Sequence, residues 1–402
     1  MNLLFLGGYF DSVLESQISS ESFSGLQYAA NKFQLNIIRG LRAEGVGFEV
    51  LSAPFIAPFP QGYKKLRFSP LKRCEDVSVH YVSFCNLWGY RNISRKRALT
   101  KAIDEFVETD VKQKIILVYS LHTPLLQAAL YAKKKDIRIK VCLVVPDLPQ
   151  YMNFSDRKRS AYKLFKKIDI WQQVRLLKGV DGFVVLTKEM ATALGVNQKP
   201  YIVVEGITDL GLKSVENNLE NKHKEKVCLY AGGLQKAYGI SLLCEAFIKA
   251  DIPNSELHIY GRGDYEDELR AICQITNKIK YLGVKPNSTI VKEEVKASLL
   301  INPRPIDSEF TKYSFPSKNM EYMASGTPLL TTKLPGMPEE YNDYVYLIEE
   351  VSVDGICRAL KNSLSLPDEV LHQKGLAARE FVLDKKNYIQ QTQRILDLVR
   401  SL

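Results

Sequence analysis

Hydrophobic and polar residues occur in blocks that predict repeated β-α-β units. Short apolar runs bounded by turn residues, such as "NLLFLG" and "KIILVYS", are separated by longer stretches with apolar residues at helical spacing, such as 33–43 and 124–133. This rhythm is typical of parallel sheets covered by helices. The other strand candidates of the first half are "GFEVLS", "VSVHYVSF", "IKVCLVVP", "GFVVLT" and "YIVV".

The rhythm stops after Val204 and then starts again. Residues 205–226 are polar, mixed in charge and poor in large apolar side chains, and "KVCLYAGG" then opens a second series of strands and helices. We therefore expect an α/β protein with two Rossmann-like, doubly wound parallel-sheet domains, residues 1–205 and 206–385. The amphipathic stretch 386–402 is expected to form a helix that packs back on the first domain. Ligands of such sheets bind outside the carboxyl ends of the strands, so the cleft between the domains is the expected site.

Composition narrows the class of protein without choosing the function. The 402 residues are 46% hydrophobic and carry a formal charge of +10, which suits an anionic partner such as a nucleotide, an acidic membrane or a nucleic acid. The seven cysteines form no C-x-x-C pair, so we expect reduced core residues. No run of ~18 apolar residues and no signal peptide is present, which predicts a cytoplasmic protein.

Two glycine pairs follow strand candidates at corresponding places in the two halves. Gly7 and Gly8 end "FLGG", and Gly232 and Gly233 end "YAGG". Bare backbone N–H groups at a strand-to-helix junction can bind a diphosphate, although a plain turn explains the same glycines. A later loop, "YGRGDYEDEL", has Glu266 where a dinucleotide-binding fingerprint needs a third glycine, so a dehydrogenase is disfavoured.

Basic residues lie at three strand ends of the second half. Lys236, Arg262 and Arg304 follow successive strand candidates. Because the carboxyl ends of parallel strands share one edge of a sheet, these side chains are expected to converge on a diphosphate. Ordinary solvated surface charge is the alternative.

The stretch "FPSKNMEYMASGTPLL", residues 315–330, predicts a helix that begins near Pro316 and stops at Gly326. Ser317 and Lys318 mark a helix start that can bind an anion. Glu321 lies about five residues deeper, or ~7 Å along the axis, a separation that suits the ribose of a nucleoside diphosphate. A solvent-facing Lys318–Glu321 pair is the alternative.

Three further features of the first half carry candidate chemistry. His122 and Asp147 follow two strand candidates of the first half and are candidates for catalysis, or for turn and cap positions. Residues 157–179 contain eight Lys or Arg and one acid, with Leu164, Ile168, Trp171 and Val174 at helical spacing. This pattern suits a basic helix on a membrane surface, or a helix whose apolar stripe packs on the sheet.

The motifs "YAGGLQKAYGI", "LHIYGRGDYEDEL" and "SFPSKNMEYMASGTPLL" resemble, in order and spacing, the donor half of glycosyltransferase family 4. The segments "ANKFQLNIIRGL" and "VCLVVPDLPQYM" of the first half resemble the acceptor domain of bacterial capsule and exopolysaccharide members. The resemblance implies the GT-B fold, sugar transfer with retention from a nucleoside diphosphate-sugar of UDP or GDP type, and a ribose-binding role for Glu321. The family's first glutamate would fall at Tyr313, and its usual donor-loop Arg and Lys at Leu234 and Tyr238.

The leading hypothesis is therefore a retaining glycosyltransferase that acts on a glycan or lipid-linked acceptor in cell-surface polysaccharide biosynthesis. No apolar strand ends in a D-x-D motif, so no catalytic metal and no other cofactor are expected. The alternatives are a GT-B-fold nucleotide-sugar epimerase or hydrolase, and a basic scaffold that binds membrane or nucleic acid. Nucleic acid is not the expected partner, because no exposed aromatics interleave with basic residues in a way that would stack on bases.

Overall fold

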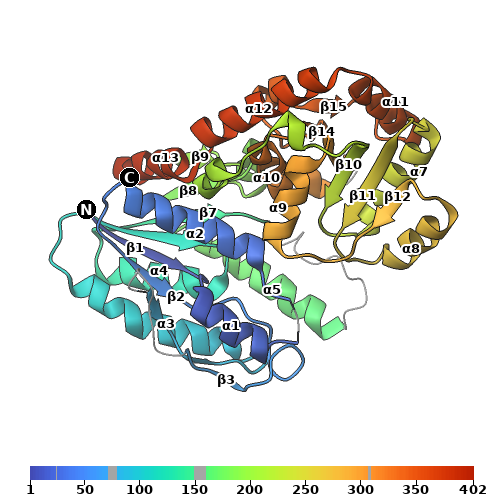
Figure 1. Cartoon of the computed structure of the whole chain (residues 1–402). Helices are drawn as coiled ribbons and strands as arrows, with labels where there is room; N and C mark the ends of the chain where they lie inside the picture. Colours follow the sequence, from blue (N-terminus) through green and yellow to red (C-terminus); the bar gives the residue numbers. More distant parts are fainter. Residues whose placement is uncertain (24, 71–78, 149–159, 307–308) are drawn as a thin grey trace. The chain divides into compact units, whose positions relative to one another are not determined.

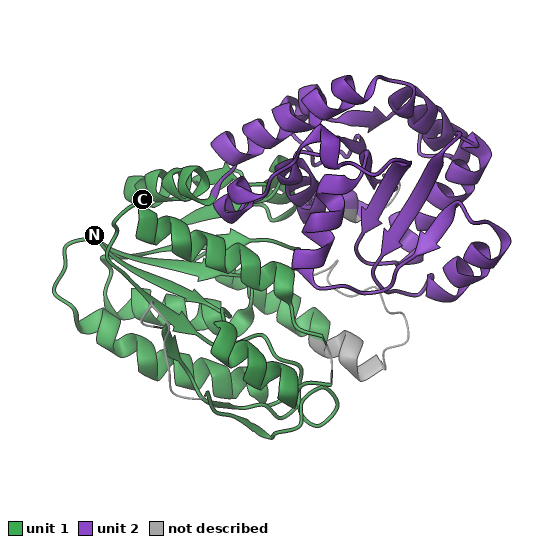
Figure 2. Ribbon diagram, viewed as in Figure 1, with its two compact units in different colours: residues 1–205, 388–402 green, residues 206–387 purple. Residues whose placement is uncertain are grey.

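The computed structural model describes residues 1–402 except 24, 71–78, 149–159 and 307–308 (Figure 1). The chain forms two compact units, residues 1–205 with 388–402 and residues 206–387 (Figure 2). Each unit contains a twisted parallel sheet with helices on both faces (Figure 1). The predicted α/β class with two Rossmann-like domains is confirmed.

The first unit is built on a seven-stranded sheet in the order β4-β2-β1-β6-β7-β8-β9. Its strands are β1 (Asn2–Gly7), β2 (Phe48–Ser52), β4 (Val79–Tyr81), β6 (Lys114–Tyr119), β7 (Ile139–Val145), β8 (Gly182–Val185) and β9 (Tyr201–Val203). Its helices are α1 (Ser12–Glu21), α2 (Tyr28–Ala43), α3 (Arg91–Glu108), α4 (Thr123–Lys135), α5 (Ser160–Leu177), α6 (Lys188–Ala193) and α13 (Tyr388–Ser401).

The second unit has a six-stranded sheet in the order β12-β11-β10-β13-β14-β15. Its strands are β10 (Lys226–Ala231), β11 (Ser255–Tyr260), β12 (Ile279–Tyr281), β13 (Leu299–Asn302), β14 (Leu329–Thr332) and β15 (Tyr346–Ile348). Its helices are α7 (Ile240–Ala250), α8 (Glu266–Ile275), α9 (Asn287–Lys296), α10 (Ser317–Ser325), α11 (Val353–Leu364) and α12 (Asp368–Lys385). Short 3₁₀ turns are η2 (Leu210–Ser214), η3 (Leu219–Asn221), η4 (Lys236–Tyr238), η5 (Glu309–Tyr313) and η6 (Glu339–Tyr344).

The apolar strands become buried because helices cover both faces of each sheet. Along β10, Val227 and Leu229 belong to one core cluster, whereas Cys228 and Tyr230 belong to the cluster on the opposite face. A strand that is buried on both sides needs a continuous apolar run, and not an alternating one. This requirement explains runs such as "VCLY".

The strand order fixes where ligands can bind. In both sheets the order reverses in the middle, between β1 and β6 in the first unit and between β10 and β13 in the second. Open parallel sheets bind ligands outside the carboxyl ends of the strands at this reversal. Gly7 ends β1, and Gly232 directly follows β10, so both glycine pairs lie at such a point.

The C-terminal helix α13 belongs to the first unit. Ile395, Leu396 and Val399 are buried, and the guanidinium of Arg394 donates a 2.9 Å hydrogen bond to the carbonyl oxygen of Val203. A Cβ at Gly40 of α2 would overlap Thr392 of α13. The missing side chain at Gly40 therefore lets the two helices approach closely.

One predicted strand was wrong. We expected residues 77–84, "VSVHYVSF", to form a single strand, but the chain forms β4 and then β5 (Phe84–Cys85). Only β4 joins the parallel sheet, whereas β5 pairs antiparallel with β3 (Arg67–Phe68). The chain leaves the sheet after Val82, whose N–H still bonds to the carbonyl oxygen of Ser52 at 3.0 Å.

Candidate functional site

The two glycine-containing loops of the second unit hold each other by direct backbone contact. Gly232 N–H donates to the Tyr260 carbonyl oxygen and Leu234 N–H to that of Arg262, both at 2.9 Å. Gly261 has φ +129°, and a Cβ there would overlap the carbonyl oxygen of Gly232. The second loop is therefore rich in glycine because it packs on the first, which a sequence motif does not reveal.

Lys318 extends from the first turn of α10 across this glycine pair. A Cβ at Gly232 would overlap the Lys318 Nζ atom. The same Nζ donates to the Tyr230 hydroxyl at 3.1 Å and lies 4.3 Å from the centre of its ring. Burial is the main cause that lowers the pKa of Lys318 to about 7; the charges of Glu321 and Glu294 partly oppose it, and the charge of Arg304 acts in the same direction as burial. The charges of Arg304 and Glu321 both act on Lys318, so the three side chains are neighbours.

Helix α10 begins without a side-chain cap. Pro316 is the N-cap residue, so the first helical residue is Ser317. Gly326 ends the helix with φ +80°, which confirms the predicted stop. Ser317 is exposed at the first helical position. Because the first N–H groups of a helix need partners, this start is suited to an anion.

The other predicted cations occupy different positions. The Arg304 guanidinium lies 5.5 Å from the ring centre of Tyr238. The Lys236 ammonium forms a 2.5 Å ion pair with Glu268, and the Lys236 N–H donates to Asp264 at 2.8 Å. Arg262 is exposed. The structure thus brings Arg304 to Lys318, whereas a carboxylate of α8 already engages the ammonium of Lys236.

Sequence reasoning missed the polar groups that hold α10 on the sheet. The side-chain amide of Asn302 donates to Asn319 at 2.7 Å, and Asn319 donates to Thr331 at 3.3 Å. The Tyr322 hydroxyl accepts the Ala231 N–H at 2.7 Å and donates to the Ala231 carbonyl oxygen at 3.1 Å. These buried bonds fix α10 against the ends of β10, β13 and β14. Asn319, placed among apolar helix positions, was the available signal.

In the first unit the glycine pair has a packing role. The Gly8 N–H donates to the Gln34 side chain at 2.8 Å, and a Cβ at Gly7 would overlap that same oxygen. A Cβ at Gly8 would come within 2.6 Å of the Phe55 ring. Gly7 and Gly8 are therefore the residues that let α2 and the loop after β2 close over the end of β1.

His122 is the N-cap residue of α4, three positions beyond β6. Its ring lies 5.4 Å from that of Phe55, edge to face, and its buried Nδ1 atom has no hydrogen-bond partner among the described residues. Burial and the charges of Arg95 and Arg91 hold the pKa of His122 well below its usual range. The imidazole is therefore neutral near pH 7.

Asp147 is exposed two residues beyond the end of β7. Burial raises the pKa of Tyr119 at the end of β6, and the charge of Asp147 raises this pKa further. The two side chains are therefore neighbours. Since β6 and β7 pair in parallel, His122 and Asp147 follow adjacent strands at one edge of the sheet. Tyr313, where the family's first glutamate was expected, lies half-buried in η5.

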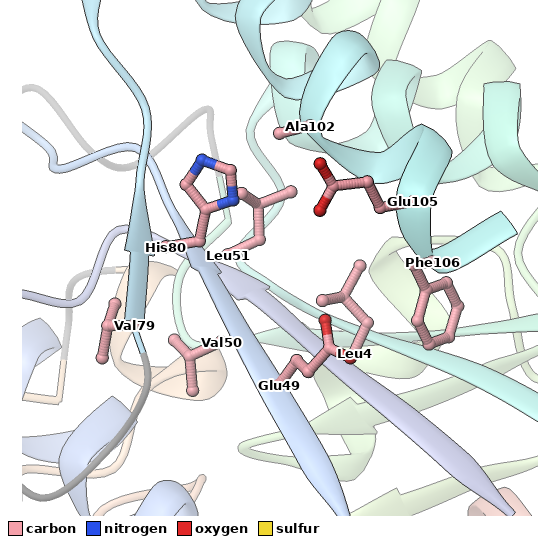
Figure 3. A pocket seen from close by; sticks show the side chains of 9 residues that line it. All are labelled: Leu4, Glu49, Val50, Leu51, Val79, His80, Ala102, Glu105 and Phe106. Carbon is pink, nitrogen blue, oxygen red and sulfur yellow. The ribbon is translucent and has the colours of Figure 1, made fainter. Parts of the chain in front are cut away.

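A separate hollow of about 240 Å³ lies in the first unit, between β2, β4 and the carboxyl half of α3 (Figure 3). Its lining residues are Leu4, Glu49, Val50, Leu51, Val79, His80, Ala102, Glu105 and Phe106. It is not at the carboxyl ends of the strands, where such sheets bind ligands. Within the described ranges, no group of three or more His, Cys, Asp or Glu side chains has an arrangement that would hold a metal ion.

Comparisons with known proteins agree with this architecture. Residues 213–381, all within the second unit, match the family model "Glycosyl transferases group 1". No curated protein sequence matched the chain. Among solved structures, the lipopolysaccharide outer core galactosyltransferase WaaB matches with a TM-score of 0.66 at 14% identity, over 100% of this chain and 99% of that one.

Two further structures cover this chain completely. HepE of Anabaena, solved in complex with UDP, matches with a TM-score of 0.66 at 14% identity over 100% of both chains. Sucrose-phosphate synthase from Thermosynechococcus elongatus matches with a TM-score of 0.65 at 14% identity, over 100% of this chain and 99% of that one. At these identities the structural likeness establishes the GT-B fold. The match of residues 213–381 to the group 1 glycosyl transferase model supports a glycosyltransferase.

Proposed function

We propose that this glycosyltransferase moves a sugar, with retention, from a nucleoside diphosphate-sugar of UDP or GDP type to a glycan or lipid-linked acceptor in cell-surface polysaccharide biosynthesis. The observation that carries the donor assignment is the position of Lys318 over Gly232, beside the uncapped start of α10. An ammonium and free N–H groups at one strand end suit a diphosphate. The UDP bound to HepE in its reported structure supports a UDP-type donor.

In this proposal the second unit holds the donor. The N–H groups of Gly232, Gly233 and the start of α10 bind the diphosphate, while Lys318 and Arg304 neutralise the charge that grows on it as the glycosidic bond breaks. Glu321, one turn deeper in α10, accepts hydrogen bonds from the two ribose hydroxyls. Arg262 is exposed beside the same loops and contacts the outer part of the donor.

The first unit holds the acceptor in this proposal. Asp147 orients the acceptor hydroxyl, and His122 shapes the site as a neutral side chain. The chemistry needs no enzyme nucleophile: the departing phosphate oxygen takes the proton of the attacking hydroxyl on the face it leaves, so the anomeric configuration is retained. The protein then contributes positioning and positive charge, and no metal or other cofactor enters the proposal.

Peripheral membrane contact through α5 is a further part of the proposal. No helix among the described residues is long and apolar enough to cross a membrane. The side chains of α5 are described from residue 166 onward, and in that part Ile168, Trp171 and Val174 are 44%, 57% and 55% exposed. An exposed apolar stripe with an aromatic and flanking lysines suits the surface of an acidic membrane.

Replacement of Glu321 tests the donor assignment. Glu321→Ala is expected to weaken binding of the matching nucleoside diphosphate by about 1.5–3 kcal/mol, because a charged hydrogen-bond acceptor for the ribose is lost. The ligand is first found by a thermal-shift screen with UDP, GDP, ADP and their sugar conjugates, and affinity is then measured by calorimetry. Glu380→Ala removes an exposed carboxylate from α12 and serves as the control. Equal affinities of the folded Glu321 and Glu380 variants would refute the ribose role.

An epimerase or hydrolase would use the same donor residues without an acceptor. Incubation with the donor sugar alone separates the two activities. Release of UDP and free or epimerised sugar, at a rate that acceptor glycans leave unchanged, would favour the alternative. The transferase requires that UDP release depend on the acceptor.

A further inference from the structure

The end of β10 is held by a side chain from α10. The Tyr322 hydroxyl accepts the N–H of Ala231 at 2.7 Å and donates to the Ala231 carbonyl oxygen at 3.1 Å. Tyr322 is 1% exposed, and Ala231 is the last residue of β10. Buried main-chain groups need hydrogen-bond partners, which a strand ordinarily finds in a neighbouring strand. Here a single phenol supplies both partners.

The strand pairing explains why Ala231 needs this partner. On one side, β10 pairs with β11 as far as Ala231, and the N–H of the next residue still bonds to β11. On the other side, β10 pairs with β13 as far as Leu229, so within the described sheet this pairing ends two residues before Ala231. This point is the reversal of strand order, where the neighbouring strands part. The Tyr322 hydroxyl takes the place of the strand that has turned away.

The same helix carries the ammonium that lies over the glycine pair. Lys318 and Tyr322 are neighbours on α10, because residues four apart lie on the same side of a helix. The Lys318 ammonium occupies the space in which a Cβ of Gly232 would lie. The Tyr230 hydroxyl accepts from this ammonium at 3.1 Å and donates to the Gly233 carbonyl oxygen at 2.7 Å. One turn of α10 therefore fixes both the backbone of the loop and the cation above it.

We propose that Tyr322 is a positioning residue for the donor: its hydroxyl keeps Gly232 beneath the ammonium of Lys318, so that a diphosphate meets the cation and the next main-chain N–H together. This inference rests on the proposed function, because it assigns a residue to the proposed diphosphate site. Tyr322 is too buried to touch the donor and acts through the backbone of β10. Without the hydroxyl, the N–H and carbonyl oxygen of Ala231 lose their partners, and the loop shifts away from α10 to find others.

The test compares two buried tyrosines of the second unit in the full-length protein. Tyr322→Phe removes the hydroxyl at the end of β10. Tyr341→Phe is the matched control, because Tyr341 is 0% exposed and its hydroxyl donates to the sulfur of Met320 at 3.6 Å. Calorimetry measures the binding of UDP and GDP to each protein. For the nucleotide that binds more tightly, Tyr322→Phe is expected to weaken binding roughly tenfold, as for the loss of a hydrogen bond, and Tyr341→Phe less than about twofold.

A double variant separates positioning from a general weakening of the fold. If Tyr322 acts by holding the backbone under the ammonium, Tyr322→Phe costs little further affinity once Lys318→Met has removed that ammonium. Additive losses in the double variant overturn the positioning role. Tyr322→p-aminophenylalanine keeps the ring and a donor, so its affinity is expected to lie between those of the unmodified protein and Tyr322→Phe. It replaces Tyr322→Phe in every comparison if that variant does not fold.

The outcomes distinguish this inference from the proposed function. If the unmodified protein binds a nucleotide and the Tyr322 and Tyr341 variants bind it equally well, the role of Tyr322 alone is overturned. If the unmodified protein binds neither UDP, GDP nor their sugar conjugates, the proposed function is refuted. Hydrogen exchange needs no ligand: residues 226–235 should exchange faster in Tyr322→Phe than in Tyr341→Phe. Equal exchange rates would show that the hydroxyl does not hold the end of β10.

Discussion

At the residue scale, Gly232 and Lys318 depend on each other. Gly232 is needed because its missing side chain leaves room for the Lys318 Nζ atom, and not because of an unusual φ angle. The sequence suggested a different reason, namely that a diphosphate approaches the bare backbone. Both reasons apply if the diphosphate contacts the ammonium and the neighbouring N–H groups together. A mutational cycle can separate them.

We predict that Gly232→Ala folds but loses donor affinity. The new methyl group meets the flexible end of Lys318, so it moves the ammonium at little cost to stability. Binding of the nucleoside diphosphate should weaken by about 1.5–3 kcal/mol, as it should in Lys318→Met. If Gly232 acts through Lys318, the double variant binds no worse than Lys318→Met, as calorimetry would show. Additive losses would instead indicate that the methyl group itself blocks the phosphates.

The lowered pKa of Lys318 predicts a pH dependence of donor binding. The pKa in the free protein is about 7, and a bound diphosphate favours the charged ammonium, which raises that pKa in the complex. Affinity for the nucleoside diphosphate-sugar should therefore be highest below pH 7 and fall as the pH rises above it, by at most about tenfold per unit. Calorimetry between pH 6 and about 9 would measure the slope. Lys318→Met should show a flat profile, and a flat profile in the unmodified protein would contradict the role of the ammonium.

At the scale of elements, α10 shows how a short helix can serve both packing and binding. Its buried side chains Met320, Tyr322 and Met323 join the core of the second unit, and Asn319 bonds to the sheet. Ser317, Lys318 and Glu321 remain at least partly accessible. Glu321 thus lies on the accessible side of a helix that is otherwise packed into the core, next to Lys318 and Arg304.

Helix α5 illustrates the limit of periodicity. Its spacing allowed either an apolar stripe packed on the sheet or a stripe facing outward, and the structure leaves Ile168, Trp171 and Val174 exposed. The nearby Arg175 guanidinium lies 4.6 Å from the ring centre of Trp171. Leu164 and Lys163, which belong to the same sequence pattern, lie outside the residues whose side chains are described. Apolar spacing alone cannot tell what covers a helix face.

We predict that α5 contributes to membrane binding. Neutralisation of Lys163, Lys166 and Lys167 to Gln should release the protein from vesicles with anionic lipid at physiological salt, because each basic residue near such a surface contributes ~1 kcal/mol. Trp171→Ser should also weaken binding, and more so at high salt, where the apolar part dominates. Vesicle co-sedimentation measures both effects. Lys188→Gln, an exposed charge on α6, is the control. Undiminished binding of the triple variant would leave α5 without this role.

At the scale of the whole molecule, the two units repeat one plan. In each sheet a glycine pair lies at the carboxyl end of a central strand, and the strand order reverses beside it. The chain passes between the units twice, after Glu205 and after Asn387, so that α13 completes the first unit. In the sequence, the amphipathic stretch 386–402 predicted a helix that packs back on the first domain, without indicating which residues it would contact. Gly40 on α2 became understandable only through its contact with α13.

The sequence by itself determined the parallel-sheet class, the start and stop of α10, and the strand ends at which the candidate residues lie. These features depend on local patterns: apolar runs of strand length, helical spacing and the left-handed conformation of Gly326. Only the tertiary structure decided which charges meet. It paired Lys236 with Glu268 and placed Lys318 over Gly232, because side-chain partners come from segments distant in the chain. No local pattern records such contacts, since they depend on strand order and on helix packing.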